Sequence, residues 1–447
     1  MNVQDKCIKC GSTDISYNIK TCKLRCNYCR YEFDSVKIEN NDISNLEGNS
    51  ISAGASDIVS DADDIITLKC SSCGSEVVID TTSSTQARCH WCRNTLSINE
   101  QVPNGAVPDM LLPFKITKEE AKIEIEKFVN KRKFYANTTF KNEFKSENIM
   151  GVFFPYMVVD LNTKAKFAGE GEHLVRRYTV GTKENRRTYY DADLYNVERE
   201  FDLLIDDLII ESNSDKLNND NLKTNNIINS ILPFDTENCI KYNSNYLKGY
   251  SSEKRDTNVD ILDQFVLTKA NDVARMACNK TLEYYDRGVK WNKEDFKVIG
   301  KNWKAAYLPV WLYSYYQKDK NLLHYIAVNA RTKEIMGSVP INQPKLILFS
   351  LLVELFGFLL MFFIDFDYNF IFLSLGFIYY FLIYNSYRNK DARHNYEFET
   401  KNNMYNLVKK DQYIKQRKGL SNSRISGENN YIIKGVEFKI KKSNDNS

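Results

Sequence analysis

The spacing of apolar and polar positions divides this chain into regions with different periodicities. Apolar residues recur at helical spacing after Thr117, which forms a capping box with Glu120, and again between residues 260 and 285. From about residue 149 to 210 the pattern alternates with period two, with a turn-like break at GTKENR. These patterns predict two long helices and a β-rich layer. We therefore expect an α+β body over residues 101–343.

Two apolar segments in this body, GVFFPYMVVD and AAYLPVWLYS, each carry a proline near the centre. Pro155 and Pro309 have no N–H to donate to a neighbouring strand. We therefore expect each of these strands to lie at a sheet edge or to contain a bulge.

A continuous apolar stretch follows the body. Residues 346–364 would form a helix of about 28 Å, which matches the hydrocarbon thickness of a bilayer. After the turn DFDYN, residues 370–387 return, so residues 344–387 predict a transmembrane helical hairpin, with a buried hairpin of a soluble domain as the alternative. Glu354 lies within the first span and should face the other helix or another subunit, because a carboxylate is costly in lipid.

The charges around this stretch predict its orientation. Lys345 precedes it, and Arg388, Lys390 and Arg393 follow it, while the turn contains no Lys or Arg. Positive residues favour the cytoplasmic side, so we expect a multi-pass cell-membrane protein with both termini in the cytoplasm. No apolar run precedes the first cysteine pair, so we expect no secretory signal. Residues 388–447 form a basic tail, which would lie on the anionic inner leaflet or remain solvated.

Two segments near the N-terminus share one cysteine pattern, C-x2-C, fifteen residues, then C-x2-C. This spacing is typical of four-thiolate zinc ribbons, whereas disulfides are disfavoured in a reducing cytosol. We expect one zinc ribbon in residues 1–34 and another in residues 67–100. The predicted Zn²⁺ ligands are Cys7, Cys10, Cys26 and Cys29 for the first ion and Cys70, Cys73, Cys89 and Cys92 for the second. Four thiolates leave no open coordination position, so both ions would be structural.

The remaining cysteines, Cys22, Cys239 and Cys278, are expected to be buried small apolar residues. His90 and Trp91 lie inside the second ribbon and are expected to pack within it, with a partner contact as the alternative. Between the ribbons, residues 35–66 are polar and acidic without an apolar period, and they predict a flexible linker.

Composition and charge narrow the function. With 61 Lys and Arg against 58 Asp and Glu, the net charge of +3 gives no strong field for polyanions. The first ribbon combines basic residues with Tyr17, Tyr28 and Tyr31, which fits nucleic-acid contact or an ordinary solvated ribbon. The chain has no phosphate-binding loop, no H-E-x-x-H and no G-x-S-x-G. We therefore expect no enzyme and identify no small-molecule substrate; a deep pocket in the β-rich body would indicate otherwise.

The order of these features resembles a known family. Tandem C-x2-C ribbons, LLPFKITKEEA, GVFFPYMVVD, AYLPVWLY, YIAVNARTKEIMGSVP and a terminal hydrophobic pair are together similar to bacterial TFIIB-type zinc-ribbon membrane proteins, over residues 1 to about 390. Members often carry names like that of the primosomal DNA helicase, but this chain lacks the loop that such an activity requires. The resemblance implies the architecture and the zinc ligands and supplies no reaction.

The sequence thus predicts cytosolic zinc ribbons and an α+β domain held at the lipid bilayer by a helical hairpin. We expect a non-enzymatic adaptor that binds protein partners. The alternative is a membrane-tethered nucleic-acid-binding protein that uses the basic first ribbon.

Overall fold

The structure is a computed structural model of the whole chain. It describes residues 7–12, 14–35, 37–38, 42–56, 65–69, 76–80, 87–90, 95–96, 101–102, 108–182, 185–212, 231–253, 255–317, 322–361, 369–388, 400–422 and 436–439. Within these residues it is a strand-rich α+β protein, as the sequence predicts.

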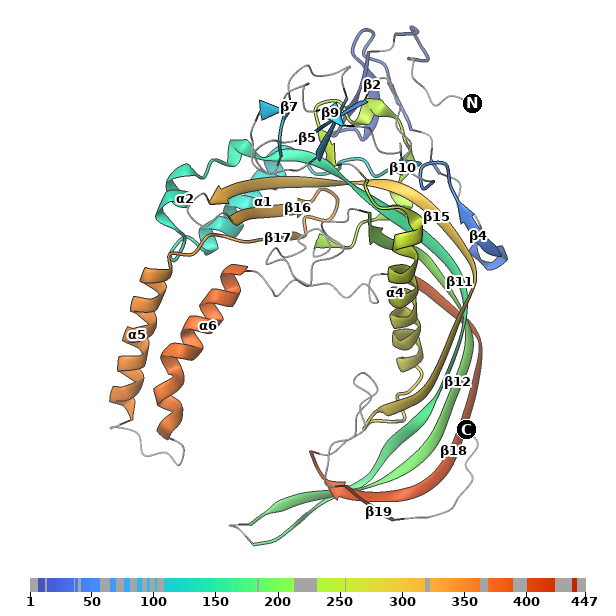
Figure 1. Cartoon of the computed structure of the whole chain (residues 1–447), viewed down its shortest axis with the longest axis vertical. Helices are drawn as coiled ribbons and strands as arrows, with labels where there is room; N and C mark the ends of the chain where they lie inside the picture. The colour runs from blue at the N-terminus through green and yellow to red at the C-terminus, as the bar shows by residue number, and fades with distance from the viewer. Residues whose placement is uncertain are drawn as a thin grey trace.

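A strongly curved sheet forms the frame of the molecule (Figure 1). Its four long strands are β11 (Met150–Val180), β12 (Arg187–Glu211), β15 (Val289–Gln317) and β18 (Lys401–Leu420). They lie in the order β15, β11, β12, β18, and each neighbouring pair is antiparallel. The shorter strands of the sheet are β4 (Gly48–Ile51), β5 (Ile65–Lys69), β6 (Glu76–Asp80), β9 (Gln101–Val102), β10 (Met110–Leu111), β13 (Ile240–Lys241), β14 (Ser251–Glu253), β16 (Leu322–Asn329), β17 (Ile335–Gly337) and β19 (Val436–Lys439).

Burial along β11 separates two parts of this sheet. Residues 151–163 are buried without interruption, because other elements cover both faces there, which explains the continuous apolar sequence. From Lys164 onward buried and more exposed positions largely alternate, as in a sheet covered on one face. We call the first part the upper body, and residues 164–180 with the paired parts of β12, β15 and β18 the arm.

Helices cover one face of each part. In the upper body, α1 (Lys118–Lys131) and α2 (Thr138–Glu143) pack on the sheet, and α1 begins at the capping box predicted at Thr117. Along the concave side of the sheet, α4 (Val259–Asn279) buries the apolar stripe that includes Leu262, Val266 and Val273 (Figure 1). Both helices predicted from apolar periodicity are confirmed.

The two prolines have a different environment from the expected one. β11 and β15 lie inside the sheet and pair with each other. Pro309 lies between the segments of β15 that pair with β10 and with β16, and Pro155 lies between the segments of β11 that pair with β14 and with β12. The strands are not at a sheet edge, because each missing N–H falls where one neighbouring strand replaces another. Both strands do contain register shifts, in agreement with the alternative expectation of a bulge, although these shifts lie away from the two prolines.

Part of the segment expected to be a flexible linker is ordered against the sheet. β4 pairs in parallel with residues 300–303 of β15. Asp109 then holds the following turn, because its carboxylate accepts hydrogen bonds from Gly54 N and Ala305 N, both at 2.8 Å. Backbone pairing, which apolar periodicity does not report, explains why residues 42–56 differ from the expectation.

The basic tail also contains an element that the sequence analysis missed. β18 pairs with β12 from Asp206 to Tyr189, and Tyr413 on β18 is buried in the core with α4. A buried ion pair strengthens this contact, with 3.0 Å between Arg199 Nη2 and Asp411 Oδ2. The many lysines of this segment obscured its alternation, and residues 401–420 do not form a solvated or lipid-bound tail.

Candidate metal centre and apolar helix pair

Four predicted ligands meet in the first ribbon. Its three strands are β1 (Ile15–Asn18), β2 (Lys23–Cys26) and β3 (Glu32–Phe33). The sulfur atoms of Cys7, Cys10, Cys26 and Cys29 all lie within 4.8 Å of one another, with 3.5 Å from Cys7 to Cys29 and 3.6 Å from Cys10 to Cys26. Zinc with bonds of about 2.3 Å separates tetrahedral sulfurs by about 3.8 Å. The group therefore has the size and donor set to hold one metal ion.

The two C-x2-C turns of this ribbon have the same backbone. Gly11 N donates to Cys7 O at 2.8 Å, and Arg30 N donates to Cys26 O at 2.9 Å. Gly11 and Arg30, each placed directly after the second cysteine, both have positive φ, 75° and 62°. Glycine adopts this conformation readily at Gly11, whereas nothing in the sequence marks it at Arg30.

The thiols of this group do not ionise together. The Cys29 amide, 3.5 Å from the sulfur, helps to hold the pKa of Cys26 at about 6. Hydrogen bonding to Ser12 acts to lower the pKa of Cys10, but desolvation and the neighbouring sulfurs outweigh it and raise that pKa to about 12. Each thiolate disfavours ionisation of the neighbouring thiols. A divalent cation would offset this repulsion and allow all four cysteines to bind it as thiolates.

The second predicted zinc site is described only at Cys89. Cys70, Cys73 and Cys92 lie outside the described residues, so that site stays a prediction. Cys89 is fully buried in a core cluster of the upper body. Next to it, His90 Nε2 lies 3.1 Å from Glu253 Oε1, and its ring packs edge-on against Phe154. His90 is therefore buried and packed, as expected, but these contacts are with β14 and β11 of the body and not within the ribbon, while Trp91 lies outside the described residues.

The remaining cysteines divide into two cases. Cys239 and Cys278 are buried, as predicted, and desolvation raises the pKa of Cys278 to about 12. Cys22 is exposed, which corrects the expectation of burial. It lies in the turn between β1 and β2 with φ of 55°, and its Sγ donates to Ile19 O at 3.6 Å within the same turn.

The first ribbon packs directly on the upper body. Tyr17 Oη donates to Phe114 O at 2.8 Å, and its ring lies 4.9 Å from that of Tyr246. Ile15 and Leu24 belong to the same buried cluster as α1. The ribbon is therefore part of the body, and Tyr28 is left 82% exposed on it.

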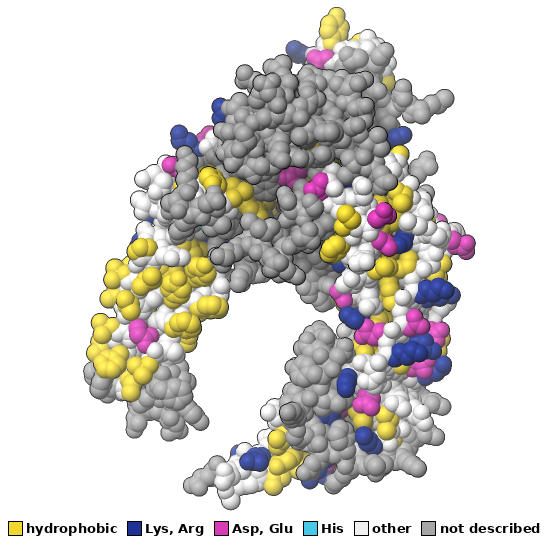
Figure 2. Space-filling model, in the orientation of Figure 1, with side chains coloured by type: hydrophobic (Ala, Val, Ile, Leu, Met, Phe, Trp, Pro, Cys, Tyr) yellow, Lys and Arg dark blue, Asp and Glu magenta, His cyan; other side chains and the backbone are white. Residues whose placement is uncertain are grey.

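Two apolar helices extend from the upper body, α5 (Gln343–Leu360) and α6 (Leu375–Arg388), and they pack against each other (Figure 1). Figure 2 shows apolar side chains along their surface. The large exposed ones are Ile347, Leu348, Leu351, Leu352, Leu355, Phe356, Phe358, Leu359, Phe377, Ile378, Phe381 and Leu382. Within the described part of the chain, α5 alone is long and apolar enough to cross a membrane, with a mean hydropathy of 1.7.

Glycine allows the close contact between these helices. A Cβ atom on Gly376 would lie 2.4 Å from Ser350 O, and one on Gly357 would lie 2.4 Å from Phe372 O. Gly376 N, in the first turn of α6, donates to Glu354 Oε2 at 2.7 Å. Glu354 therefore faces the other helix, as expected, and satisfies an amide that α6 itself leaves free.

An acidic cluster that sequence reasoning missed lies where the sheet bends. Oxygens of Asp160, Asp206 and Asp207 lie within 4.8 Å of one another, and burial raises the pKa of Asp206 to about 6. Lys304 Nζ donates to Asp160 at 2.9 Å, and Thr236 Oγ1 donates to Asp207 at 2.6 Å. Only the register between β11 and β12 brings these residues together, so periodicity could not indicate the cluster.

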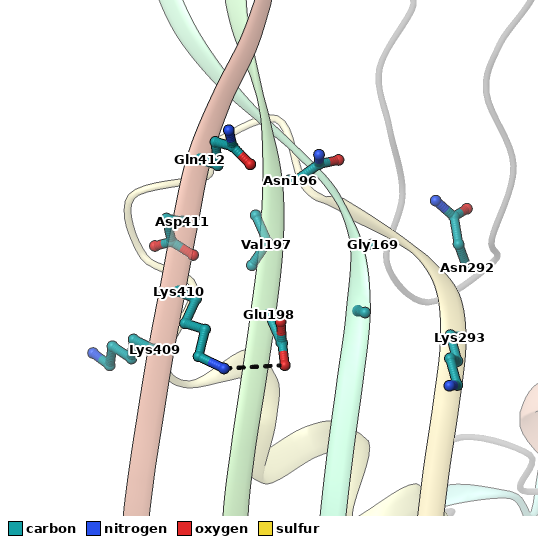
Figure 3. A pocket seen from close by; sticks show the side chains of 11 residues that line it. Gly169, Asn196, Val197, Glu198, Asn292, Lys293, Lys409, Lys410, Asp411 and Gln412 are labelled. Carbon is teal, nitrogen blue, oxygen red and sulfur yellow. Dashed lines mark ion pairs between the residues drawn. The ribbon is translucent and has the colours of Figure 1, made fainter. Parts of the chain in front are cut away.

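An open hollow of about 860 Å³ crosses the four long strands in the arm (Figure 3). Its lining residues are Ala168, Gly169, Asn196, Val197, Glu198, Asn292, Lys293, Lys409, Lys410, Asp411 and Gln412. Glu198 forms ion pairs with Lys166 at 2.7 Å and with Lys410 at 3.7 Å. Val197 packs in the core with α4, so the adjacent Glu198 points to the opposite face. This is open polar surface rather than a deep pocket.

Comparisons with known proteins add no relative. No family model, no curated protein and no solved structure matches this chain. The fold and the site therefore define it as a strand-rich α+β protein. Its described residues include a four-cysteine group that could hold a metal ion and one helix that is able, by length and composition, to cross a membrane.

Proposed function

We propose that this chain is a membrane-anchored zinc-ribbon protein that acts as a non-enzymatic adaptor for protein partners. The observation that carries the proposal is the large exposed apolar surface of α5 and α6. Soluble monomers rarely expose a continuous patch of this kind, and a bilayer would remove it from water. The resemblance to bacterial zinc-ribbon membrane proteins is part of the same proposal.

Several features support a hairpin with two spans. The 3-10 helix Asn369–Ser374 runs directly into α6, so residues 369–388 are long enough to cross a bilayer. Lys345 at the start of α5 and Arg388 at the end of α6 lie at the same end of the helix pair, as the positive-inside rule requires for two cytoplasmic termini. A cytoplasmic ribbon would keep its thiols reduced and available for zinc.

The ribbon supplies a surface for the adaptor role. Four thiolates fill the coordination shell and leave no position for water or substrate. Zinc would therefore have a structural role and stabilise the ribbon fold. Tyr28 is 82% exposed and Tyr31 is 39% exposed, on a ribbon whose apolar residues Ile15, Leu24 and Phe33 are buried against the body. Exposed aromatic side chains are common anchors in protein interfaces.

Fractionation of cell membranes tests the anchor. We expect the full chain to resist extraction with alkaline carbonate. The variant Leu352→Arg/Phe356→Arg places two charges on exposed positions of α5 and should be extracted. The matched variant Val175→Arg/Val180→Arg, also at exposed apolar positions but on the arm, should remain with the membrane. Extraction of the unchanged chain would refute the proposal.

The ribbon surface also favours a second candidate, a membrane-tethered nucleic-acid-binding protein. Lys9 Nζ lies 5.8 Å from the centre of the Tyr31 ring, and Tyr28 offers an open face for stacking. Fluorescence anisotropy with labelled DNA and RNA would test it, using the full chain in detergent at several salt concentrations. This candidate requires binding that weakens steeply with salt and is lost in Tyr28→Ala. Absence of binding at low salt would leave the protein-adaptor proposal. Copurification would then identify the protein partner.

A further inference from the structure

Basic and aromatic residues from a distant part of the sequence lie at the base of the α5–α6 pair. α1 ends at Lys131 and is followed by Arg132, Lys133 and Phe134, which the fold places beside Lys345 at the start of α5. We call these five residues the collar. The charges of α1 are distant from the membrane segment along the sequence, and only the fold brings them to its base.

Specific contacts fasten the collar to both helices. Lys345 Nζ donates to Phe134 O at 2.9 Å and lies 3.7 Å from the centre of the Phe134 ring. The Phe134 ring also meets Phe349 of α5 edge-on at 5.2 Å. On the other side, Arg132 Nε donates to Ser386 O of α6 at 3.2 Å. The collar therefore keeps its place at the end of the helix pair that joins the body.

Two charges of the collar, those of Lys131 and Lys133, are not neutralised by carboxylates of the residues that the structure describes. Lys131 and Lys133 are exposed, and neither forms an ion pair with any residue that the structure describes. Of the nearby acids on α1, Glu124 pairs with Lys127 at 2.8 Å, and Glu126 accepts a hydrogen bond from Ser146 at 2.7 Å. Two free ammonium groups thus remain beside an apolar surface.

This composition matches the headgroup level of a membrane. Lysines there attract anionic lipids, and the apolar ring of Phe134, which is 54% exposed, would be removed from water at the boundary between headgroups and acyl chains. We propose that the collar binds anionic phospholipid headgroups at the cytoplasmic leaflet and rests the C-terminal end of α1 on the bilayer. This inference depends on the membrane anchor proposed above and names the lipid class that the anchor selects.

Native mass spectrometry of the full chain in detergent tests the inference with phosphatidylglycerol as the anionic probe and phosphatidylcholine as the zwitterionic one. We expect the chain to bind phosphatidylglycerol more tightly. Lys131→Gln/Lys133→Gln should weaken that binding by about 25-fold, since each lysine near a membrane surface contributes about a fivefold factor. Binding of phosphatidylcholine should not change.

The matched control is Lys293→Gln/Lys297→Gln, which removes two exposed lysines from the arm and should leave phosphatidylglycerol binding unchanged. Equal binding of the two lipids, an equal loss in the control, or full displacement of phosphatidylglycerol by inorganic phosphate would each overturn the inference. Resistance to extraction with alkaline carbonate tests the membrane anchor independently of lipid preference. A collar variant that stays in the membrane but loses lipid preference supports both proposals, and an unchanged chain that is extracted refutes the anchor itself.

Discussion

At the scale of single residues, the metal centre depends on two equivalent turns made from different side chains. Gly11 adopts positive φ at little cost, whereas Arg30 adopts the same conformation with a Cβ atom. The repeated hydrogen bonds from Gly11 N and Arg30 N orient both cysteine pairs toward one point. A metal ion at that point would hold the strained turn at Arg30 in place, so metal binding and ribbon folding should be one event.

The first prediction concerns this coupling. In Cys26→Ser, we expect the purified full chain to lose one zinc ion, because three thiolates bind the metal less tightly and the ribbon loses its structure without it. Zinc content measured by elemental analysis checks the loss. Cys22→Ser is the control, since Cys22 lies in the same ribbon but is exposed and outside the four-cysteine group. Equal zinc content in both variants would contradict the assignment.

A second prediction follows from the acidic cluster. The folded-state pKa of Asp206, about 6, lies above the unfolded value of about 3.9. The folded state therefore holds the proton more tightly, and the charged carboxylate destabilises the fold above about pH 6 but not below about pH 4. Asp206→Asn should raise the thermal midpoint at pH 7.5 by a stabilisation of about 1 kcal/mol or less, because the side chain is partly exposed.

The pH dependence separates this cause from a general effect of the substitution. At pH 4 the midpoints of the unchanged chain and Asp206→Asn should converge. Asp295→Asn, at an exposed position of the arm, should give no difference at either pH. A stabilisation of Asp206→Asn that is the same at both pH values would exclude the proposed electrostatic origin.

At the scale of elements, the contact between α5 and α6 depends on the absence of a side chain at Gly376. In Gly376→Val, the added atoms would overlap Ser350 O and separate the helices, which should cost about 1–3 kcal/mol. We expect a lower thermal midpoint in detergent and faster proteolysis between the helices. Leu382→Val, at a position of α6 that is 62% exposed, should change neither. An unchanged midpoint in Gly376→Val would mean that the helices do not pack in this way.

The elements that sequence reasoning found are those with local signals. α1 carries its own capping box, and α4 carries a full apolar stripe, so both could be predicted without knowledge of their neighbours. β18 could not, because its pairing depends on β12, which precedes it by about two hundred residues, and its lysines face outward. The positions of Pro155 and Pro309 likewise depend on where neighbouring strands end.

The candidate sites follow the same division. The four ligands of the first ribbon have a fixed spacing along the chain, so each of these cysteines could be predicted from the sequence. The acidic cluster and the collar have no such spacing, because each is assembled by contacts between distant segments. Glu354 is intermediate: its cost in lipid indicated that it faces another helix, but only the structure identifies Gly376 N as its partner.

At the scale of the whole molecule, the arm and the α5–α6 pair extend from the upper body toward the same side, and the arm reaches beyond the helices (Figures 1 and 2). The outer face of the arm carries Lys166, Glu198 and Lys410, which belong in water. A flat bilayer around a spanning hairpin would meet the arm and enclose these charged side chains. Membrane insertion therefore requires either the hairpin to swing at its base or the arm to straighten where the sheet bends.

Distances between paired spin labels would check this expectation in lipid nanodiscs. We expect the separation between a label at Leu382 and one at Lys415 to exceed the separation in this structure. Labels at Ile123 and Leu382 tell the two movements apart, because only a swing of the hairpin changes that second distance. A Leu382–Lys415 distance that matches this structure, in a chain that resists carbonate extraction, would contradict the expectation.

The unbroken length of β11 has a mechanical consequence. Its 31 residues span about 100 Å at about 3.3 Å per residue, from the upper body to the far end of the arm. A load applied along the arm would act along the strands. Their backbone hydrogen bonds to β12 and β15 would then be sheared together instead of being peeled apart one by one. The arm should therefore resist extension along its length.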